Sequence, residues 1–264
     1  ENSPANEVGL ERGSLIIAAN NKKINSSDLF YITAPEEAYL FTLGKFNETG
    51  FDTLQTVQMP APRIVENENL YKWNIFEVNG KNVAYILYNE FGDNDTQNLS
   101  NMFSQLSGQT INDIVLDLRY NPGGYVNTAQ LISTNLAPQE AMGNVFLKMT
   151  HNDKINRTDI LNFEPELLAG AASLNYENLY IITSSNTASA SEIVINCLKP
   201  YMAGRLIQVG TATFGKNVAQ QLYTDEVQAP MLEFWLTNSL LSNAEDNSDY
   251  YTNGLLPDYE ISEN

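Results

Sequence analysis

The chain has 264 residues, 43% of them hydrophobic, which is enough for one or two globular domains with a sizeable core. Fourteen basic and thirty-two acidic residues give a net charge of −18, which argues against nucleic-acid partners because neutralising phosphates needs clustered lysine and arginine. No run approaches the ~18 apolar residues of a membrane span, and the first residues lack the basic and apolar run of a signal peptide.

The single cysteine and the single histidine narrow the possible chemistry. Cys197 excludes an internal disulfide and a thiolate-rich metal site, and its apolar neighbours predict a buried position in a helix. His151 has no ligand spacing around it, so a histidine metal site or a Ser-His-Asp triad would rest on that residue alone. We therefore expect no metal and no cofactor.

Residues 1–62 predict a small α+β domain. The expected elements are strands over 15–19, 39–43 and 51–57, and a helix over roughly 28–35 that Ser26-Ser27-Asp28 would cap. Pro60, Pro62 and the acidic stretch 66–69 indicate a linker, so we expect a second domain over 63–264.

The second domain predicts an α/β fold. Its expected elements are a hairpin of 73–78 and 83–88 around Asn79-Gly80, helices over roughly 95–107, 125–136 and from 189, and strands over 114–118, 145–150, 178–183, 205–209 and 232–241. Alternating strands and helices predict a mostly parallel central sheet with helices on both faces. The nearly continuous apolar run 114–118 is typical of a strand that is covered on both sides.

Ser189 lies where the helix from 189 should begin, in Thr187-Ala188-Ser189-Ala190-Ser191-Glu192. Ser189 and Glu192 fit a capping box, which is the common meaning of this pattern. A serine at a strand-to-helix turn can also act as a nucleophile, because the backbone N–H groups behind it face a developing oxyanion. In that case Ser191 would cap the helix while Ser189 points outward.

Lys216 follows a glycine in the stretch Gly210–Asn217, which matches G-x-x-x-x-G-K. The phosphate-binding loop requires serine or threonine where Asn217 stands, and residues 218–223 resemble a strand more than a helix. We therefore expect no nucleotide. Burial lowers the pKa of a lysine and allows it to act as a general base, and Val209, Phe214 and Val218 are expected to shelter Lys216.

The turn Asn121-Pro122-Gly123-Gly124 follows the apolar run 114–118. One interpretation is a tight connection whose glycines adopt unusual φ angles. The other is functional, since glycine leaves a backbone N–H open to a substrate oxygen.

These motifs, taken in chain order with Gln220-Gln221 and Asn253-Gly254-Leu255-Leu256-Pro257-Asp258, resemble the carboxyl-terminal processing proteases, which are tail-specific serine peptidases. The resemblance spans roughly residues 72–260. The first 55 residues or so resemble the middle of a PDZ domain whose front is absent. The family implies a ClpP/crotonase-like domain preceded by a partial PDZ-like domain.

The resemblance implies a role for each matching position. Ser189 would be the nucleophile and Lys216 its general base, with Gln220 orienting the base. The oxyanion hole would be formed by the N–H groups of Ala190 and Gly123.

Gly124 would be a second choice of oxyanion donor, and Glu192 would have a supporting role. The sequence departs from the family in two respects. The interval from Ser189 to Lys216 is about two residues longer, and Asn217 replaces a glycine.

The implied activity is that of a serine endopeptidase that cuts proteins or peptides near their C-termini through an acyl-enzyme. The implied location is the periplasm or cell envelope of a bacterium. The alternative is a catalytically inactive peptide- or ligand-binding protein on the same fold, as interphotoreceptor retinoid-binding proteins exemplify.

Overall fold

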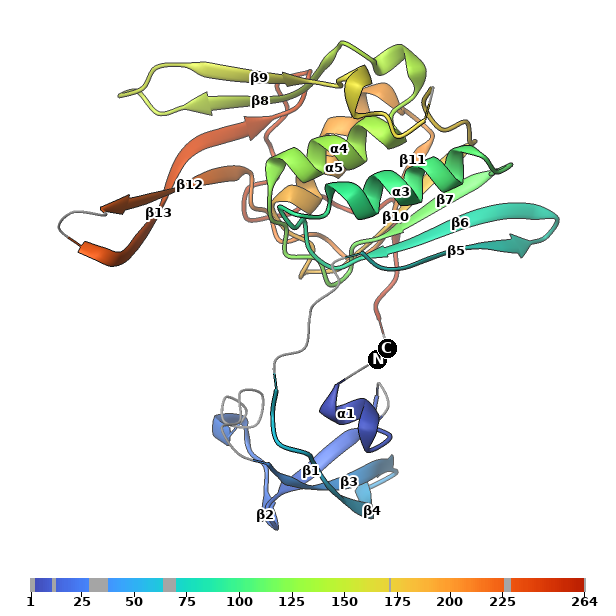
Figure 1. Cartoon of the computed structure of the whole chain (residues 1–264), viewed down its shortest axis with the longest axis vertical. Coiled ribbons are helices and arrows are strands. Elements are labelled where there is room, and N and C mark those ends of the chain that lie inside the picture. Colours follow the sequence, from blue (N-terminus) through green and yellow to red (C-terminus); the bar gives the residue numbers. More distant parts are fainter. Residues whose placement is uncertain are drawn as a thin grey trace. The chain divides into compact units, whose positions relative to one another are not determined.

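A computed structural model describes residues 3–10, 13–28, 38–63, 70–170, 172–225 and 229–263 (Figure 1). The chain divides into two compact units, Glu1–Asn67 and Glu68–Asn264. Each unit is described by itself. The helix expected over 28–35 falls almost wholly outside the described residues.

The first unit contains a four-stranded antiparallel sheet in the order β2-β1-β3-β4. Its elements are α1 (Pro4–Glu7), β1 (Leu15–Ala19), β2 (Lys22–Lys23), the 3-10 turn η1 (Ser26–Asp28), β3 (Leu40–Asn47) and β4 (Gly50–Gln58). The three predicted strands are confirmed, and β3 runs four residues beyond its predicted end. Phe41 and Leu43 on β3 are buried and form the core of this unit. Its PDZ-like character stays a prediction.

The second unit is built on a six-stranded sheet in the order β14-β11-β10-β7-β6-β5. Its strands are β5 (Leu70–Val78), β6 (Lys81–Tyr88), β7 (Asp113–Asp117), β10 (Asn178–Thr183), β11 (Leu206–Gly210) and β14 (Tyr259–Glu260). All neighbours pair in parallel except β5 and β6, which form the predicted hairpin. Asn79 and Gly80 both have positive φ, as a two-residue hairpin turn requires.

Three helices cover this sheet: α3 (Thr96–Ser107), α4 (Val126–Leu136) and α5 (Ala190–Leu198). From β6 through β7 and β10 to β11, each parallel strand is added on the same side of the one before. Right-handed crossovers that always advance in one direction place their helices on one face, and α3, α4 and α5 lie side by side (Figure 1). The prediction of helices on both faces is therefore wrong for the described residues.

Burial alternates along β10 and β11, in agreement with this single helix layer. On β10, Leu179 and Ile181 are fully buried, whereas Tyr180 is only half-buried. On β7, Ile114 and Leu116 are buried on one face and Asp113 and Asp117 on the other, so this strand is covered on both faces, as predicted.

A second, antiparallel sheet of this unit has the order β12-β13-β8-β9. Its strands are β8 (Val145–His151), β9 (Thr158–Asn162), β12 (Val218–Asp225) and β13 (Ala229–Ser242). Three short 3-10 turns are η2 (Gln139–Ala141), η3 (Pro165–Leu167) and η4 (Lys199–Tyr201). The paired parts of β12 and β13 extend away from the helices as a two-stranded ribbon (Figure 1).

The parallel strands bring three chain segments to one edge of the six-stranded sheet. β7 ends at Asp117, β10 at Thr183 and β11 at Gly210, and the segments that follow them carry the three sequence motifs. The carboxyl ends of parallel strands are the usual place for a site in an open α/β sheet. Within the described ranges, no helix is both long and apolar enough to cross a membrane.

Candidate active site

Ser189 occupies a strained turn between a strand and a helix. It directly precedes α5, and its φ of 55° and ψ of −114° lie where residues other than glycine are rare. A backbone of this kind costs about 1–3 kcal/mol and persists only where its surroundings enforce it. Strand-to-helix turns with this strain expose the nucleophilic serine of α/β-hydrolases. The side chain is half-buried, so it is within reach of solvent.

Ser189 and Glu192 form the predicted capping box. Its carboxylate half is a hydrogen bond of 2.8 Å from the Ser189 N–H to Glu192 Oε2, whereas its hydroxyl half is too loose to count as one. Ser191 does not take over the cap as expected, because its hydroxyl is buried and donates to the carbonyl of Asn121. The capping and nucleophile interpretations are therefore compatible, since the box uses the carboxylate and not the Ser189 oxygen.

Asn121 joins the glycine turn to the serine loop. Its side chain is fully buried and donates to the carbonyl of Tyr88 at 3.0 Å. Its own carbonyl accepts the N–H of Ala188 and the hydroxyl of Ser191, both at 3.1 Å. A displacement of either loop would break these buried bonds, so the two loops form one structure.

Gly123 packs directly against the serine. Its φ is +107°, and a Cβ added there would lie 2.7 Å from the Ser189 Cβ and 2.9 Å from the Ala190 nitrogen. Only glycine fits this approach, because both the backbone angle and the space exclude a side chain. The structure thus brings Gly123, Ser189 and Ala190 together, as the resemblance implies.

The predicted oxyanion donors differ in their present partners. The Gly123 N–H donates to Asn121 Oδ1 at 2.9 Å. The N–H groups of Ala190 and Gly124 have no hydrogen-bond partner within the described ranges. In this conformation the N–H groups of Ala190 and Gly124 are therefore available to bind an oxyanion. The Gly123 N–H would first have to break its hydrogen bond to Asn121.

Glu192 holds the serine loop and the lysine loop together. Its carboxylate is fully buried, and Oε1 accepts from the Thr213 hydroxyl and the Gly215 N–H, both at 2.6 Å. Oε2 accepts from the N–H groups of Ser189 and Lys216, both at 2.8 Å. Because these two nitrogens share one oxygen, they lie within 5.6 Å of each other, 2.8 Å on each side. The S-x-x-E pattern indicated the cap but gave no sign of the partners in the lysine loop.

Lys216 and Gln220 meet as predicted. Lys216 Nζ donates to Gln220 Oε1 at 3.1 Å. In the described structure Nζ makes no hydrogen bond to Ser189 Oγ. The expected apolar shelter is incomplete, because Phe214 is 61% exposed and Lys216 itself only half-buried.

Lys199 is a second lysine near helix α5. Burial lowers the pKa of Lys199, although the charge of Asp258 opposes this shift. It follows the last residue of α5, ten residues after Ser189 and so roughly 15 Å from it by the rise of a helix, which is too far for it to act on that serine.

The phosphate-loop alternative lacks its helix. Val218–Asp225 after Lys216 form the strand β12, as predicted, so no helix N-terminus follows the lysine. Within the described ranges, no group of three or more histidine, cysteine, aspartate or glutamate side chains could hold a metal ion.

His151 has neighbours that resemble a conventional triad. Its Nε2 lies 2.8 Å from Asp159 Oδ2, and its Nδ1 lies 3.4 Å from Ser239 Oγ. Ser239 is buried near the end of β13, and its hydroxyl donates to Asn238 Oδ1 at 2.7 Å. A serine that is buried in a strand, with no helix N-terminus behind it, cannot present its oxygen to a peptide. This trio is therefore structural.

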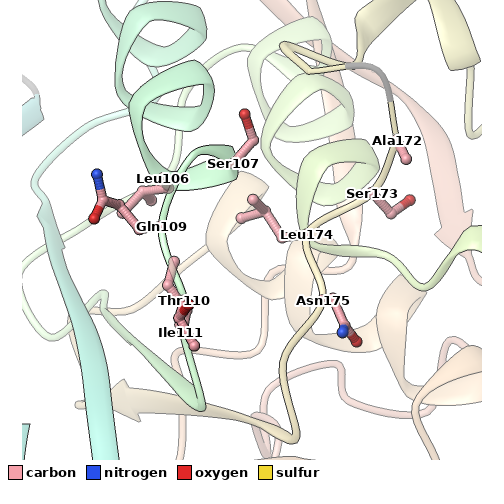
Figure 2. Close-up of a pocket in the computed structure, with 9 residues that line it drawn as sticks. All are labelled: Leu106, Ser107, Gln109, Thr110, Ile111, Ala172, Ser173, Leu174 and Asn175. Carbon is pink, nitrogen blue, oxygen red and sulfur yellow. The ribbon is translucent and has the colours of Figure 1, made fainter.

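A cavity of about 520 Å³ lies between the end of α3 and residues 172–175 (Figure 2). Leu106, Thr110 and Leu174 are among the residues that line it, and none of its lining side chains is charged. The lining segments precede β7 and β10, whereas the Ser189 loop follows β10, so the cavity lies at the opposite edge of the sheet. It contributes nothing to the site around Ser189.

Comparisons with known proteins agree with this arrangement. The profile of peptidase family S41 matches residues 82–261. The chain is 31% identical over 229 residues to a carboxyl-terminal-processing protease of Picosynechococcus, covering 84% of this chain and 50% of that protein. It is 26% identical to the carboxy-terminal processing protease CtpB of Bacillus subtilis, covering 83% of this chain and 43% of that protein. The chain thus spans about half the length of these curated relatives.

Solved structures share the fold. A putative S41 protease from Bacteroides fragilis superposes with a TM-score of 0.85 at 33% identity, over 99% of this chain and 69% of that one. The photosystem II D1 C-terminal processing protease superposes with a TM-score of 0.60 at 19% identity, over 98% of this chain and 66% of that one, which shows likeness of fold alone.

Proposed function

Because the chain belongs to peptidase family S41, we propose that it is a serine endopeptidase that cuts protein substrates near their C-termini. The observation that carries this proposal is the Glu192 carboxylate, which binds the backbone of Ser189 and of Lys216 with one oxygen. This contact holds the backbone nitrogens of Ser189 and Lys216 within 5.6 Å of each other, 2.8 Å on each side, which supports the proposed serine–lysine pair. The C-terminal preference is inferred from the names of its relatives.

In the proposed reaction, Ser189 Oγ attacks the scissile carbonyl carbon while its proton passes to Lys216 Nζ. Lys216 would swing from Gln220 to Ser189, which its flexible side chain permits over the short separation of the two backbones. The oxyanion would be bound by the Ala190 N–H together with a glycine N–H of the turn at Gly123 and Gly124.

The tetrahedral intermediate then collapses. The C–N bond breaks, and the leaving amine takes the proton from Lys216. In the second half of the reaction, water gives a proton to Lys216 and its oxygen attacks the acyl carbon; the C–Oγ bond then breaks, Lys216 returns the proton to Ser189 Oγ, and the product leaves with its new carboxyl group. Gln220 would hold Lys216 between these steps through its Oε1 acceptor.

The proposal is tested by incubating the full chain with casein. We expect cleavage by the parent and by Ser185→Ala, whose exposed serine lies on the same loop, and a loss of at least about 1,000-fold in Ser189→Ala and Lys216→Ala. The rate should rise with pH, because a lysine acts as a base only when neutral. Equal cutting by the parent and Ser189→Ala, or a rate independent of pH, would contradict the proposed pair.

The alternative is a binding protein that retains the fold without the reaction. It predicts that casein stays intact with every variant while peptides still bind. The periplasm or cell envelope of a bacterium stays our prediction for where the protein works.

A further inference from the structure

The ribbon of β12 and β13 carries apolar side chains on the same face as Gln220. Residues directly opposite each other in an antiparallel pair share a face, and faces alternate along a strand. Gln220 is opposite Thr237, and two residues further on, Leu222 is opposite Trp235. Two residues before Gln220, Val218 is opposite Leu240. One extra residue of β13, Asn238, lies between the two pairs as a bulge, so Leu240 stays on the face of Gln220 and Trp235.

Leu222, Trp235 and Leu240 therefore flank Gln220 on one face, and we call these three residues the apolar stripe. The side chains of the stripe are 39%, 55% and 43% exposed, respectively. The opposite face is the one that packs on the body at the base of the ribbon, since Ser239 and Leu241 are buried there. Exposed apolar side chains that adjoin a site are typical of a binding surface.

Exposure alone does not single out the stripe. Phe234 is 48% exposed and lies on the opposite face of the ribbon, opposite Tyr223. What distinguishes the stripe is its continuity with the site, because its face also carries Gln220, whose Oε1 accepts from Lys216. A molecule that contacts Lys216 and Gln220 can reach Leu222 without crossing to another face.

β12 also offers backbone groups to an extended peptide. It is the terminal strand of its sheet in the part of the chain described, so its outer edge is open. A peptide that adds to such an edge gains main-chain hydrogen bonds, and alternate side chains set its specificity. Gln220 and Leu222 are two residues apart, roughly 7 Å along a strand, which is also the spacing of alternate side chains in an extended peptide.

We propose that the stripe is a substrate subsite: the peptide extends along β12, and an apolar side chain close to the scissile bond packs on Leu222 and Trp235. This inference rests on the proposed peptidase function for the identity of its ligand. It adds that cleavage favours substrates with an apolar residue at one alternate position near the cut.

The first experiment measures cleavage of two unstructured peptides that share a site mapped in casein. One carries leucines at alternate positions beside the cut, and its twin carries serines there. We expect the full chain to prefer the leucine peptide by about ten-fold in kcat/KM, as burial of part of a leucine side chain predicts. Trp235→Ser and Leu222→Ser should reduce this preference to less than about three-fold, mainly through KM.

Phe234→Ser is the matched control, because it removes a neighbouring aromatic residue of similar exposure from the opposite face. It should retain the ten-fold preference. An equal loss in Phe234→Ser and Trp235→Ser, or an unchanged preference in Trp235→Ser, would overturn the subsite.

The second experiment separates this proposal from the peptidase proposal. Binding of two fluorescein-labelled peptides of equal length, one with leucine and one with serine at every second position, is measured by anisotropy in the Ser189→Ala background, where neither cleavage nor a mapped site is needed. Tighter binding of the leucine peptide that Trp235→Ser abolishes and Phe234→Ser preserves supports the subsite even if the parent cuts nothing. Cleavage by the parent with no such difference in binding would leave the peptidase standing and reject the subsite.

Discussion

We call the Glu192 carboxylate and its four hydrogen-bond donors the Glu192 clamp. Its last donor, Lys216, is two residues before the β12–β13 ribbon, yet the clamp and the ribbon differ in burial and in polarity. The clamp is a fully buried carboxylate with four donors, and it fixes two loops to each other. The ribbon is exposed on both faces beyond its base. Rigid, satisfied polar contacts suit the placement of reacting groups, whereas an exposed apolar face suits the binding of varied chains. Substitutions in the two regions should therefore change different properties.

The largest loss of stability is expected for Glu192→Leu. It leaves four buried donors without an acceptor, and at about 1 kcal/mol or more for each, the unfolding free energy should fall by about 4 kcal/mol. Activity should be lost as well, because Ser189 and Lys216 are no longer joined. Urea unfolding checks the prediction, with Glu166→Leu on the exposed turn η3 as the control. Similar losses of unfolding free energy in both variants would show that the buried Glu192 carboxylate stabilises the fold no more than an exposed one.

The second largest effect is expected for Arg119→Met. Arg119 donates to Asp117 at 2.7 Å, and Asp117 is fully buried, so the variant leaves a buried carboxylate short of its cation at a cost of about 3 kcal/mol. Arg157→Met is the control, since its partner Asp159 is much more exposed and an exposed ion pair contributes little to stability. Urea unfolding of both variants measures the two losses of unfolding free energy. A loss in Arg157→Met as large as in Arg119→Met would contradict the prediction.

The same pair predicts a dependence of stability on pH. Burial by itself would raise the pKa of Asp117, but hydrogen bonds from Arg119 and Tyr85 outweigh it and leave that pKa lowered. A lowered pKa stabilises the fold above the unfolded value of about 4, and this contribution is lost as pH falls through the folded pKa. The parent should therefore lose more stability between pH 6 and pH 3 than Asp117→Asn does. Parallel curves for the two proteins would argue against this assignment.

A smaller loss is expected for Gly123→Ala. The added Cβ would meet Ser189 and Ala190 at under 3 Å, and φ is +107°, so about 2 kcal/mol of stability and at least about 100-fold of activity should be lost. Gly143→Ala separates strain from crowding, because Gly143 has a φ of +80° but nothing within 4 Å. It should cost only about 1 kcal/mol and leave casein cleavage unchanged. Equal activity in the two variants would remove Gly123 from the site.

The smallest change in stability is expected on the ribbon. Trp235→Ser removes a side chain that is 55% exposed, so the free energy of unfolding should change by less than about 0.5 kcal/mol. The shift in melting temperature measures this change. A loss above 1 kcal/mol would mean that Trp235 stabilises the fold, and its exposure would then not mark a binding surface.

The sequence by itself determined the local structure of this protein. Asn79-Gly80 predicted the hairpin, and the pattern of residues 95–107 predicted the helix α3. That Gly123 lies against Ser189 and that Lys216 contacts Gln220 was implied by the family resemblance of the motifs and not by their local geometry.

Only the tertiary structure decided how distant segments combine. The order of the strands placed the helices on one face of the sheet. Hydrophobic periodicity could not predict this, because it does not show which strands are neighbours. The tertiary structure also gave Glu192 its partners in the lysine loop, packed Gly123 against Ser189, and left Phe214 exposed. These outcomes depend on contacts between residues far apart in the chain, and a local pattern carries no information about such contacts.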